Sequence, residues 1–247
     1  MNFFSLFKRK IIYTLKRKIN IDKDTVKFNS IDDLFYYYGS DKSNIFKINN
    51  EKGHGFSKYY DLQLKDYKNK ELKILEVGSY AGASAASFKK YFPNSQIFCF
   101  DINISNFKFF SKNIHVYGID IANEKKLKKT LNIIFDKYKF EYFDIIIDDG
   151  SHNLSDILLS FKNLFDYLNR KGVYIIEDFK FPNYFQRNND IDHIFIDELI
   201  NKINSKNFFV SSLIDKKFQT KVFSEINEII TYRGNLEHSD ICFLKKN

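Results

Sequence analysis

Two acidic motifs in the second half of the chain carry the clearest indication of chemistry. Asp148-Asp149-Gly150-Ser151-His152 and Glu177-Asp178 each follow directly on a run of apolar residues. If the two runs are neighbouring strands of a parallel sheet, Asp149, Glu177 and Asp178 converge at its carboxyl edge. Three carboxylates in one place need a counter-charge, and a hard divalent cation with oxygen ligands supplies it well. These residues therefore predict a site for Mg²⁺ or Mn²⁺.

His152 lies three residues after Asp149 and is expected to stand next to that ion. Because imidazole titrates near neutral pH, His152, with Asp149 beside it, is the candidate catalytic base. Neither motif contains a second His or a Cys, which disfavours zinc and two-histidine iron sites. The plainer alternative is that Asp149 and Asp178 cap the helices that follow them and that His152 lies on the surface.

A third motif, Glu76-Val77-Gly78-Ser79-Tyr80-Ala81-Gly82, is expected at a strand-to-helix turn. Gly78 and Gly82 allow the backbone to turn tightly and to approach a ligand closely. Their spacing differs from the Gly-x-Gly-x-x-Gly of nicotinamide enzymes, and no phosphate-loop Lys follows, so neither NAD nor ATP is favoured. On its own, this motif is also compatible with a purely structural turn.

Two more acids end the next two expected strands. Asp101 follows Gly82 by about 20 residues, where dinucleotide-type sites place the acid that accepts from a ribose. Asp120 ends the following strand, where a carboxylate can meet the edge of an adenine. One such acid could be a helix cap, but acids at three successive strand ends favour a pocket for a nucleoside-containing cofactor.

These motifs belong to a repeating pattern of short apolar runs and longer amphipathic segments. The runs are 72–77, 97–100, 114–117, 143–147 and 173–176, and the segments between them are 84–91, 105–111, 124–138 and 154–168. A helix is expected around 191–203, and the last two runs, 228–232 and 240–243, predict an antiparallel hairpin. The predicted fold is α/β, with a Rossmann-like, mostly parallel sheet, a C-terminal antiparallel hairpin and helices on both faces.

The amino-terminal residues differ from the rest of the chain in charge. Residues 1–20 contain six basic and no acidic residues, whereas the whole chain has a net charge of +8, so the remainder is nearly neutral. A nearly neutral domain argues against a nucleic-acid partner. Apolar residues recur in this segment at a spacing of four: Phe3, Phe7, Ile11, Leu15 and Ile19. They predict a basic amphipathic helix over 1–20, which packs on its own domain, on a partner or on an anionic membrane surface.

The remaining organisation is simple. Residues 21–70 are expected to form a helical lead-in over the cofactor, and residues 71–247 the cofactor-binding domain. Cys99 and Cys242 lie far apart in apolar runs and indicate buried thiols of a reducing compartment. With no apolar stretch long enough to span a membrane, the expected location is cytoplasmic, with residues 1–20 able to reach the inner face of the membrane.

Taken together, the motifs resemble those of class I S-adenosylmethionine-dependent methyltransferases. More narrowly, they resemble the metal-dependent sugar O-methyltransferases of the mycinamicin and macrocin type, with the cephalosporin-hydroxylase-like proteins of polysaccharide clusters nearby. The resemblance covers residues 36–180, including Tyr38–Lys42 and His54–Tyr60 of the lead-in. Its specific part is the pair formed by Ile147–His152 and Ile175–Phe179, because the glycine motif alone fits any methyltransferase.

The resemblance implies S-adenosylmethionine as the cofactor and a role for each motif. Glu76, Gly78, Asp101 and Asp120 would hold the cofactor, with Ser79, Tyr80, Gly82, Ile102 and Asp148 beside them and Lys42, His54 and Tyr59 folded over it from the lead-in. Mg²⁺ would be bound by Asp149, Glu177 and Asp178, and His152 would act as the base.

The activity expected on this basis is O-methylation of a sugar hydroxyl. The expected acceptor is a capsular or other surface polysaccharide, or its nucleotide-sugar precursor. Two alternatives stay open: a methyltransferase of a small-molecule natural product, and a non-catalytic Rossmann-type module held at a membrane or a partner. Residues 181–225 match no motif and are expected to form the acceptor pocket, and assembly as a homo-oligomer is a further expectation.

Overall fold

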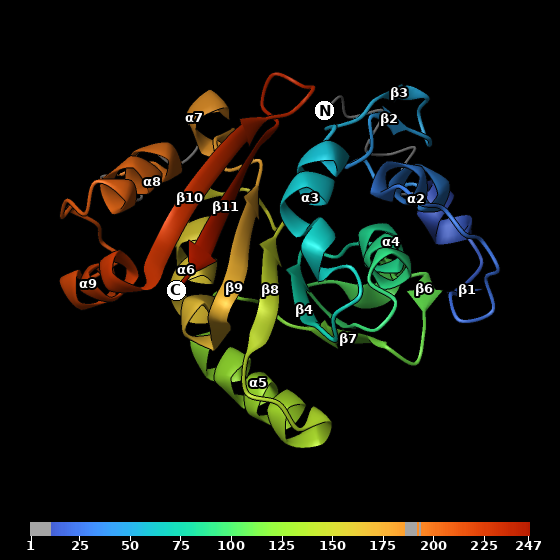
Figure 1. The fold of residues 1–247 in the computed structure, drawn as a ribbon, viewed down its shortest axis with the longest axis horizontal. Coiled ribbons are helices and arrows are strands. Elements are labelled where there is room, and N and C mark those ends of the chain that lie inside the picture. The colour runs from blue at the N-terminus through green and yellow to red at the C-terminus, as the bar shows by residue number, and fades with distance from the viewer. Residues whose placement is uncertain (1–10, 186–191, 193) are drawn as a thin grey trace.

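A seven-stranded sheet runs through the middle of the structure, a computed structural model that describes residues 11–185, 192 and 194–247 (Figure 1). Its strand order is β10-β11-β9-β8-β4-β5-β7. The five strands with parallel pairing are β4 (Lys73–Val77), β5 (Gln96–Asp101), β7 (Ile114–Gly118), β8 (Phe143–Asp148) and β9 (Leu168–Glu177). β11 (Asp240–Lys246) is antiparallel to both of its neighbours, β9 and β10 (Ile226–Arg233). The predicted mostly parallel sheet with a C-terminal antiparallel hairpin is confirmed.

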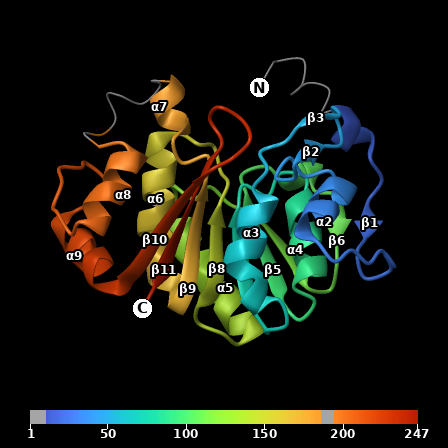
Figure 2. The same ribbon diagram turned by 45° about the horizontal axis from the view of Figure 1, so that its top comes forward.

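Helices cover both faces of the sheet. Side chains alternate between the faces along each strand, and the apolar side chains on each face are buried under helices. Ile74 and Ile97 belong to one buried cluster, whereas Leu75 and Phe98 belong to the other. The first cluster is covered by α2 (Ile31–Tyr38), α3 (Ser57–Leu64) and α4 (Ala83–Tyr91). The second is covered by α5 (Glu124–Tyr138), α6 (Leu154–Leu164), α8 (Ile196–Asn204) and α9 (Lys216–Glu225). Figure 2 shows the sheet between these two groups. The prediction of helices on both faces is confirmed.

The segment 105–111 is not the amphipathic helix that its pattern suggests. It contains a short 3₁₀ turn, Ile104–Asn106, and the two-residue strand β6 (Phe109–Phe110). Seven residues are too few to distinguish a helix from other structure by periodicity. β6 pairs in parallel with β1 (Ile19–Asn20), and Phe109 is fully buried. This connection therefore fastens the amino-terminal segment to the domain.

The helix predicted over residues 1–20 ends early in the described part of the chain. Residues 11–15 are helical, but Ile19 lies in β1, so the predicted helix is wrong for its last residues, and residues 1–10 lie outside the described part. Tyr13 is buried, and its hydroxyl donates a hydrogen bond to the Gly39 carbonyl at 2.8 Å. Its ring stands edge-on to Tyr80, with 5.6 Å between centroids. The described part of this segment therefore packs on its own domain.

The lead-in, residues 21–70, contains short strands and a 3₁₀ turn in addition to helices. Between α2 and α3 it forms a small hairpin of β2 (Ile45–Phe46) and β3 (Glu51–Lys52), and a 3₁₀ turn, Lys65–Tyr67, follows α3. Ser30 caps the start of α2 by accepting from the Asp33 amide, and Gly39 ends it in the left-handed conformation. The chain ahead of α3 is thereby directed across the strand ends. Among the described residues, no helix has the length and apolar character needed to cross a membrane.

Candidate active site

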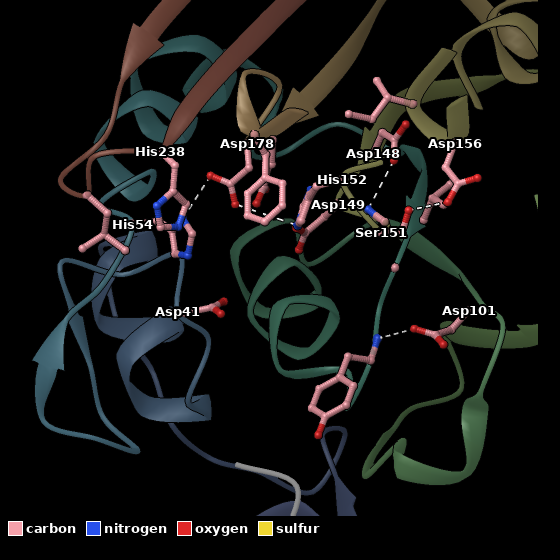
Figure 3. Close-up of a pocket in the computed structure, with 18 of the residues that line it drawn as sticks. Asp41, His54, Asp101, Asp148, Asp149, Ser151, His152, Asp156, Asp178 and His238 are labelled. Atoms are coloured by element: carbon pink, nitrogen blue, oxygen red, sulfur yellow. Dashed lines mark hydrogen bonds and ion pairs between the residues drawn. The ribbon is translucent and has the colours of Figure 1, made fainter. Parts of the chain in front are cut away.

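A cleft of about 1190 Å³ runs along the carboxyl ends of the parallel strands (Figure 3). One end is lined by residues that follow β5 and β7, among them Asp101, Ile102 and Asp120. Asp149, His152 and Asp178 line its middle, and residues of the β2–β3 and β10–β11 connections line the other end. Because pockets for one small ligand usually measure about 300–1,000 Å³, the cleft has room for more than one.

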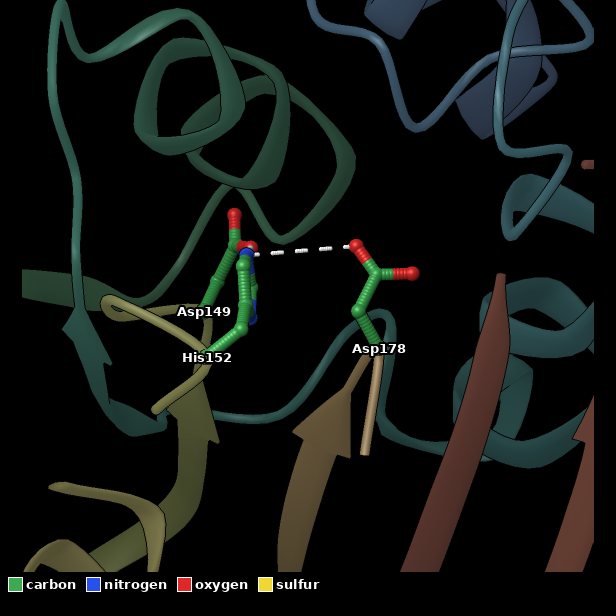
Figure 4. A group of neighbouring side chains, drawn as sticks. All are labelled: Asp149, His152 and Asp178. Atoms are coloured by element: carbon green, nitrogen blue, oxygen red, sulfur yellow. Dashed lines mark ion pairs between the residues drawn. The ribbon is translucent and has the colours of Figure 1, made fainter. Parts of the chain in front are cut away.

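Three side chains with metal-binding atoms meet in the middle of the cleft (Figure 4). Asp149 and His152 follow β8, and Asp178 follows β9, and the candidate ligand atoms all lie within 4.8 Å of one another. His152 Nε2 is 3.7 Å from Asp149 Oδ1 and 3.9 Å from Asp178 Oδ2. His152 and Asp178 have left-handed backbone conformations, with φ of 58° and 48°. Such strain is typical of functional positions, where the surrounding structure must hold it.

Glu177, the third predicted metal ligand, faces a different set of partners. One of its carboxylate oxygens accepts from the Tyr60 hydroxyl, and the other lies 2.6 Å from Lys42 Nζ. Lys42 also pairs with Asp149, so this one ammonium group joins the two acidic motifs. The described structure therefore brings Asp149 and Asp178 together with His152, and directs the Glu177 carboxylate toward Lys42 and Tyr60 instead. Sequence spacing placed the three acids at one edge but could not show which way each points.

Burial is the largest influence on the pKa values of Lys42, Glu177 and Glu76. It lowers the pKa of Lys42, but Asp149 and Glu177 more than offset it, so the pKa ends well above its usual value. Burial raises the pKa of Glu177 to about 8, in spite of the neighbouring Lys42. The buried acids Glu177 and Glu76 and the half-buried Asp149 lie around the ammonium group of Lys42, and burial also raises the pKa of Glu76. Burial therefore favours the uncharged form of Glu177 and Glu76.

This donor set fits a divalent cation. Asp149 and Asp178 offer hard carboxylate oxygens at the edge of an open cleft, and Mg²⁺ is commonly held by one or two carboxylates while keeping several waters. Asp149 and Asp178 are the residues that would hold it, with His152 beside it.

The turn after β4 brings the glycine motif against the acidic motif of β8. Gly78 has φ of 84°, and a Cβ at this position would lie 1.9 Å from the Asp149 carbonyl oxygen. Gly78 N donates to the Phe100 carbonyl at 2.8 Å, which fixes the turn to β5. Only glycine satisfies both the positive φ and the close approach. Gly78 and Tyr80 line the cleft.

Asp101 and Asp120 occupy the positions expected for nucleoside recognition. Asp101 Oδ2 accepts from the Tyr80 amide at 2.7 Å and Oδ1 from the Asn103 amide at 2.8 Å, so it also stabilises two turns. Asp120 Oδ1 accepts from the Ala122 amide at 3.0 Å. Each carboxylate oxygen has more than one acceptor site, so binding to hydroxyls is still available. Ile102, 78% exposed, adds an apolar surface beside Asp101.

Asp148 lines the same cleft and is buried. Its Oδ1 accepts from the Gly150 amide at 3.3 Å, whereas its Oδ2 has no hydrogen-bond partner among the described residues. Burial raises the pKa of Asp148 to about 7. A buried acceptor without a partner in a ligand-sized cleft is a place for a donor from a bound molecule. The residues of this half of the cleft thus fit a cofactor that contains a nucleoside.

Five other residues predicted to contact the cofactor lie outside the main cleft or at its margin. Glu76 is fully buried beneath the turn, and Ser79 and Lys42 line a small adjoining pocket. Gly82 has φ of 81° and packs against the Phe107 ring. Tyr59 stacks on Tyr232 with 4.3 Å between centroids and donates to the Arg233 carbonyl at 2.5 Å. The expectation that Tyr59 contacts the cofactor therefore does not hold in this structure, because its ring and hydroxyl serve the β10–β11 hairpin.

His54, by contrast, lines the cleft. Its Nδ1 lies 3.2 Å from Asp178 Oδ1 and 2.8 Å from Ser239 Oγ. Burial lowers the pKa of His54, but the adjacent Asp178 raises it further, to about 9. His54 therefore carries a positive charge next to Asp178 at neutral pH.

The structure also reveals site residues that the sequence did not indicate. Tyr60 holds Glu177, and Phe181, Leu236, Glu237 and His238 line the end of the cleft beyond His152. Among the described residues of 181–225, the predicted acceptor segment, Phe181 alone lines the cleft. The β10–β11 turn contains no sequence motif that marks a functional site. It reaches the cleft only because β10 and β11 pair at the end of the sheet. The sequence around Phe181 likewise contains no motif that marks it as a site residue.

The sheet order, with antiparallel β11 between β9 and β10 and an acidic cleft at the carboxyl edge, defines the fold of class I methyltransferases. In sequence, the chain is similar to mycinamicin VI 2''-O-methyltransferase of Micromonospora griseorubida, with 31% identity over 134 residues that cover 51% of this chain. It is also similar to demethylmacrocin O-methyltransferase of Streptomyces fradiae, with 30% identity over 132 residues and 51% coverage. The match covers 31% and 32% of these proteins, so the chain corresponds to about a third of their length.

A solved structure supports the fold. The MycE methyltransferase of the mycinamycin biosynthetic pathway, in complex with Mg, SAH and mycinamycin VI, superposes with a TM-score of 0.66 and 21% identity. The superposition covers 89% of this chain and 55% of that one. No protein-family model matches the chain. The resemblance to macrolide sugar O-methyltransferases, expected from the motifs, is thus found again in sequence and fold.

Proposed function

We propose that this chain is an S-adenosylmethionine- and Mg²⁺-dependent O-methyltransferase that acts on a sugar hydroxyl of a small-molecule glycoside. The observation that carries the proposal is the meeting of Asp149, His152 and Asp178 within 4.8 Å, midway along a cleft whose one end has Asp101 and Asp120. In this proposal Asp149 and Asp178 would hold the cation and His152 would act as the base, between a cofactor end with Asp101 and Asp120 and an acceptor end opposite to it.

Each part of the cleft has a distinct task in this reaction. When bound, S-adenosylmethionine supplies an activated methyl group, and Mg²⁺ supplies Lewis-acid activation of a sugar hydroxyl. Asp101 and Asp120 position the cofactor by accepting hydrogen bonds from it. His152 would take the proton of the acceptor hydroxyl at Nε2, and loss of the methyl group from its sulfonium sulfur would leave S-adenosylhomocysteine. Asp149 and Asp178, at 3.7 and 3.9 Å from Nε2, stabilise the imidazolium that results.

The relatives favour a small-molecule glycoside over a surface polysaccharide. Five curated relatives are named as O-methyltransferases that act in macrolide or tetracenomycin chemistry, two of them on rhamnosyl tetracenomycin compounds. Their names describe those proteins, and the chain covers about a third of the length of each. They nevertheless support a glycosyl group as the class of acceptor for this chain, ahead of a capsular polymer or a nucleotide sugar.

The first test is the identification of a methylated product. The chain is incubated with S-adenosylmethionine, MgCl₂ and a panel of methyl glycosides, including methyl α-L-rhamnopyranoside, next to a nucleotide sugar and a capsular polysaccharide. Mass spectrometry is expected to show one added methyl group on the sugar of a glycoside. Methylation confined to the polymer or the nucleotide sugar would contradict the small-molecule assignment, and no methylation of any acceptor would contradict the activity.

A further inference from the structure

The end of the cleft beyond His152 has an unusual lining. Around it lie acids and histidines, whereas Phe181 presents a partly exposed aromatic ring. The turn between β10 and β11 adds Leu236, Glu237 and His238. We call Phe181 and Leu236–His238 the acceptor wall. Phe181 and Leu236 give this end of the cleft an apolar surface beside its charged groups.

The Phe181 ring has a fixed position relative to the candidate base. Its centroid lies 5.5 Å from that of His152 and 5.7 Å from that of His238, with interplanar angles of 45° and 83°. The Phe181 amide donates to the Asp178 carbonyl at 2.8 Å, so α7 (Phe181–Phe185) begins in a tight turn after the cation site. Figure 3 shows His152, Asp178, His54 and His238 in sequence along this side of the cleft.

The β10–β11 turn is held in place by the lead-in. The Asn235 amide donates to the His54 carbonyl at 2.8 Å, and Ser239 Oγ lies 2.8 Å from His54 Nδ1. Gly55 has φ of 69°, and a Cβ there would come within 2.1 Å of the Asn235 side chain. Such close contact leaves the turn little freedom, so Leu236–His238 are positioned before any ligand arrives.

We propose that the acceptor wall is the subsite that holds the sugar ring of the acceptor, an inference that rests on the proposed O-methyltransferase function. The C–H face of a pyranose ring packs on Phe181, and His238 and Glu237 form hydrogen bonds with the hydroxyls that are not methylated. An apolar platform with a few convergent polar groups is the usual composition of a specific small-molecule site. The wall thereby determines which sugar, and which of its hydroxyls, reaches His152.

Direct binding tests this inference without turnover. The chain contains no Trp, so Phe181→Trp introduces a single tryptophan into the wall, and Phe110→Trp places one on β6, outside the cleft, as the matched control. Both variants, saturated with S-adenosylhomocysteine and MgCl₂, are titrated with each methyl glycoside of the panel. A saturable fluorescence change in Phe181→Trp and none in Phe110→Trp is expected. No change in Phe181→Trp with any glycoside would overturn the inference, whatever the activity of the wild type.

Kinetics separates a role in acceptor binding from a role in folding. Phe181→Ala is expected to raise KM for the acceptor about tenfold to a hundredfold, the usual cost of a lost apolar contact, while its S-adenosylhomocysteine affinity stays at the wild-type value. Phe181→Trp should restore part of the loss. An active wild type with an unchanged acceptor KM in Phe181→Ala would refute the wall but leave the methyltransferase assignment intact.

A deoxy acceptor tests the polar half of the wall. In the wild type, removing the hydroxyl that His238 contacts should raise KM, and in His238→Ala the same removal should have little further effect. This non-additivity is the signature of a direct contact. Fully additive losses for every deoxy position would show that His238 does not contact the sugar.

Discussion

Neighbouring carboxylates of this cleft behave differently because of what surrounds each of them. Glu177 is buried between Tyr60 and Lys42, whereas Asp178, one residue later, faces His54 and the cleft. Asp149 contacts both groups of residues: it pairs with Lys42, and it lies beside His152 and Asp178 in the candidate cation site. The buried ammonium group of Lys42 is therefore the cation that Asp149 and Glu177 share.

Lys42→Met tests the contribution of this shared cation. The substitution leaves the buried Glu177 and the half-buried Asp149 without their cation, and breaking a buried ion pair usually costs about 3–5 kcal/mol. The free energy of unfolding, from urea titrations in EDTA, is expected to fall by about that amount. Lys128→Met is the matched control, because Lys128 forms an exposed pair with Glu124, and its stability should stay close to wild type. Equal stability of the two variants would contradict the buried network.

His152 is the residue whose chemistry can be isolated from binding. His152→Ala is expected to lower kcat about 10²–10⁴-fold, the usual contribution of a general base, with the S-adenosylhomocysteine affinity from calorimetry nearly unchanged. His152→Gln should not recover the rate, because an amide does not accept the proton. A wild-type kcat in His152→Ala would remove it as the base, and lost cofactor binding would make its role structural.

At the scale of elements, β7 contains a histidine whose environment couples folding to pH. His115 is partly buried, and its Nδ1 lies 3.0 Å from the Tyr138 hydroxyl of α5. Burial, assisted by Lys137 and Lys73, lowers the pKa of His115 from 6.5 to about 4. As the pH falls below 6.5, the unfolded chain binds the proton first, so stability is lost between pH 6.5 and 4.

The loss should amount to about 1–3 kcal/mol, with allowance for the partial exposure of the ring. It is measured by urea unfolding at pH 7.5, 5.5 and 4.5. His115→Gln removes the titration but keeps a hydrogen-bonding side chain at this position. As the pH falls, the unfolding free energy of the wild type should therefore decrease relative to that of His115→Gln. A pH-independent difference would show that His115 does not titrate in this range.

The elements also show where sequence reasoning succeeds. The helix over 124–138 was predicted from its amphipathic pattern, and all seven sheet strands were predicted from their short apolar runs. The runs of β4, β5, β8, β9 and β11 are buried almost throughout, which leaves little ambiguity. The helix expected over 105–111 was wrong, because its apolar residues serve a short strand and the packing of Phe107 against Gly82. The lead-in hairpin was not predicted, since two-residue strands have no period of their own.

At the scale of the molecule, the topology explains how much of the site was accessible from sequence. Asp101, Asp120, Asp149 and Asp178 were predicted to share one edge, because each follows a parallel strand, and they all line the cleft. Contacts between distant segments were not predicted. Tyr60 contacts Glu177 because the lead-in lies over the strand ends, and His238 contacts Phe181 because the last hairpin does so as well. Roles that depend on these closures need the three-dimensional structure.

The proposed function requires a divalent cation between the two halves of the cleft, and removal of that cation is the most direct test. Initial rates of methyl transfer to the best glycoside of the panel are measured in EDTA, after readdition of MgCl₂, and for Asp178→Asn in MgCl₂. We predict no turnover in EDTA, full recovery with Mg²⁺ or Mn²⁺, and a strongly reduced rate in Asp178→Asn that higher MgCl₂ partly restores. Full turnover by chelated, metal-free wild type would contradict the account.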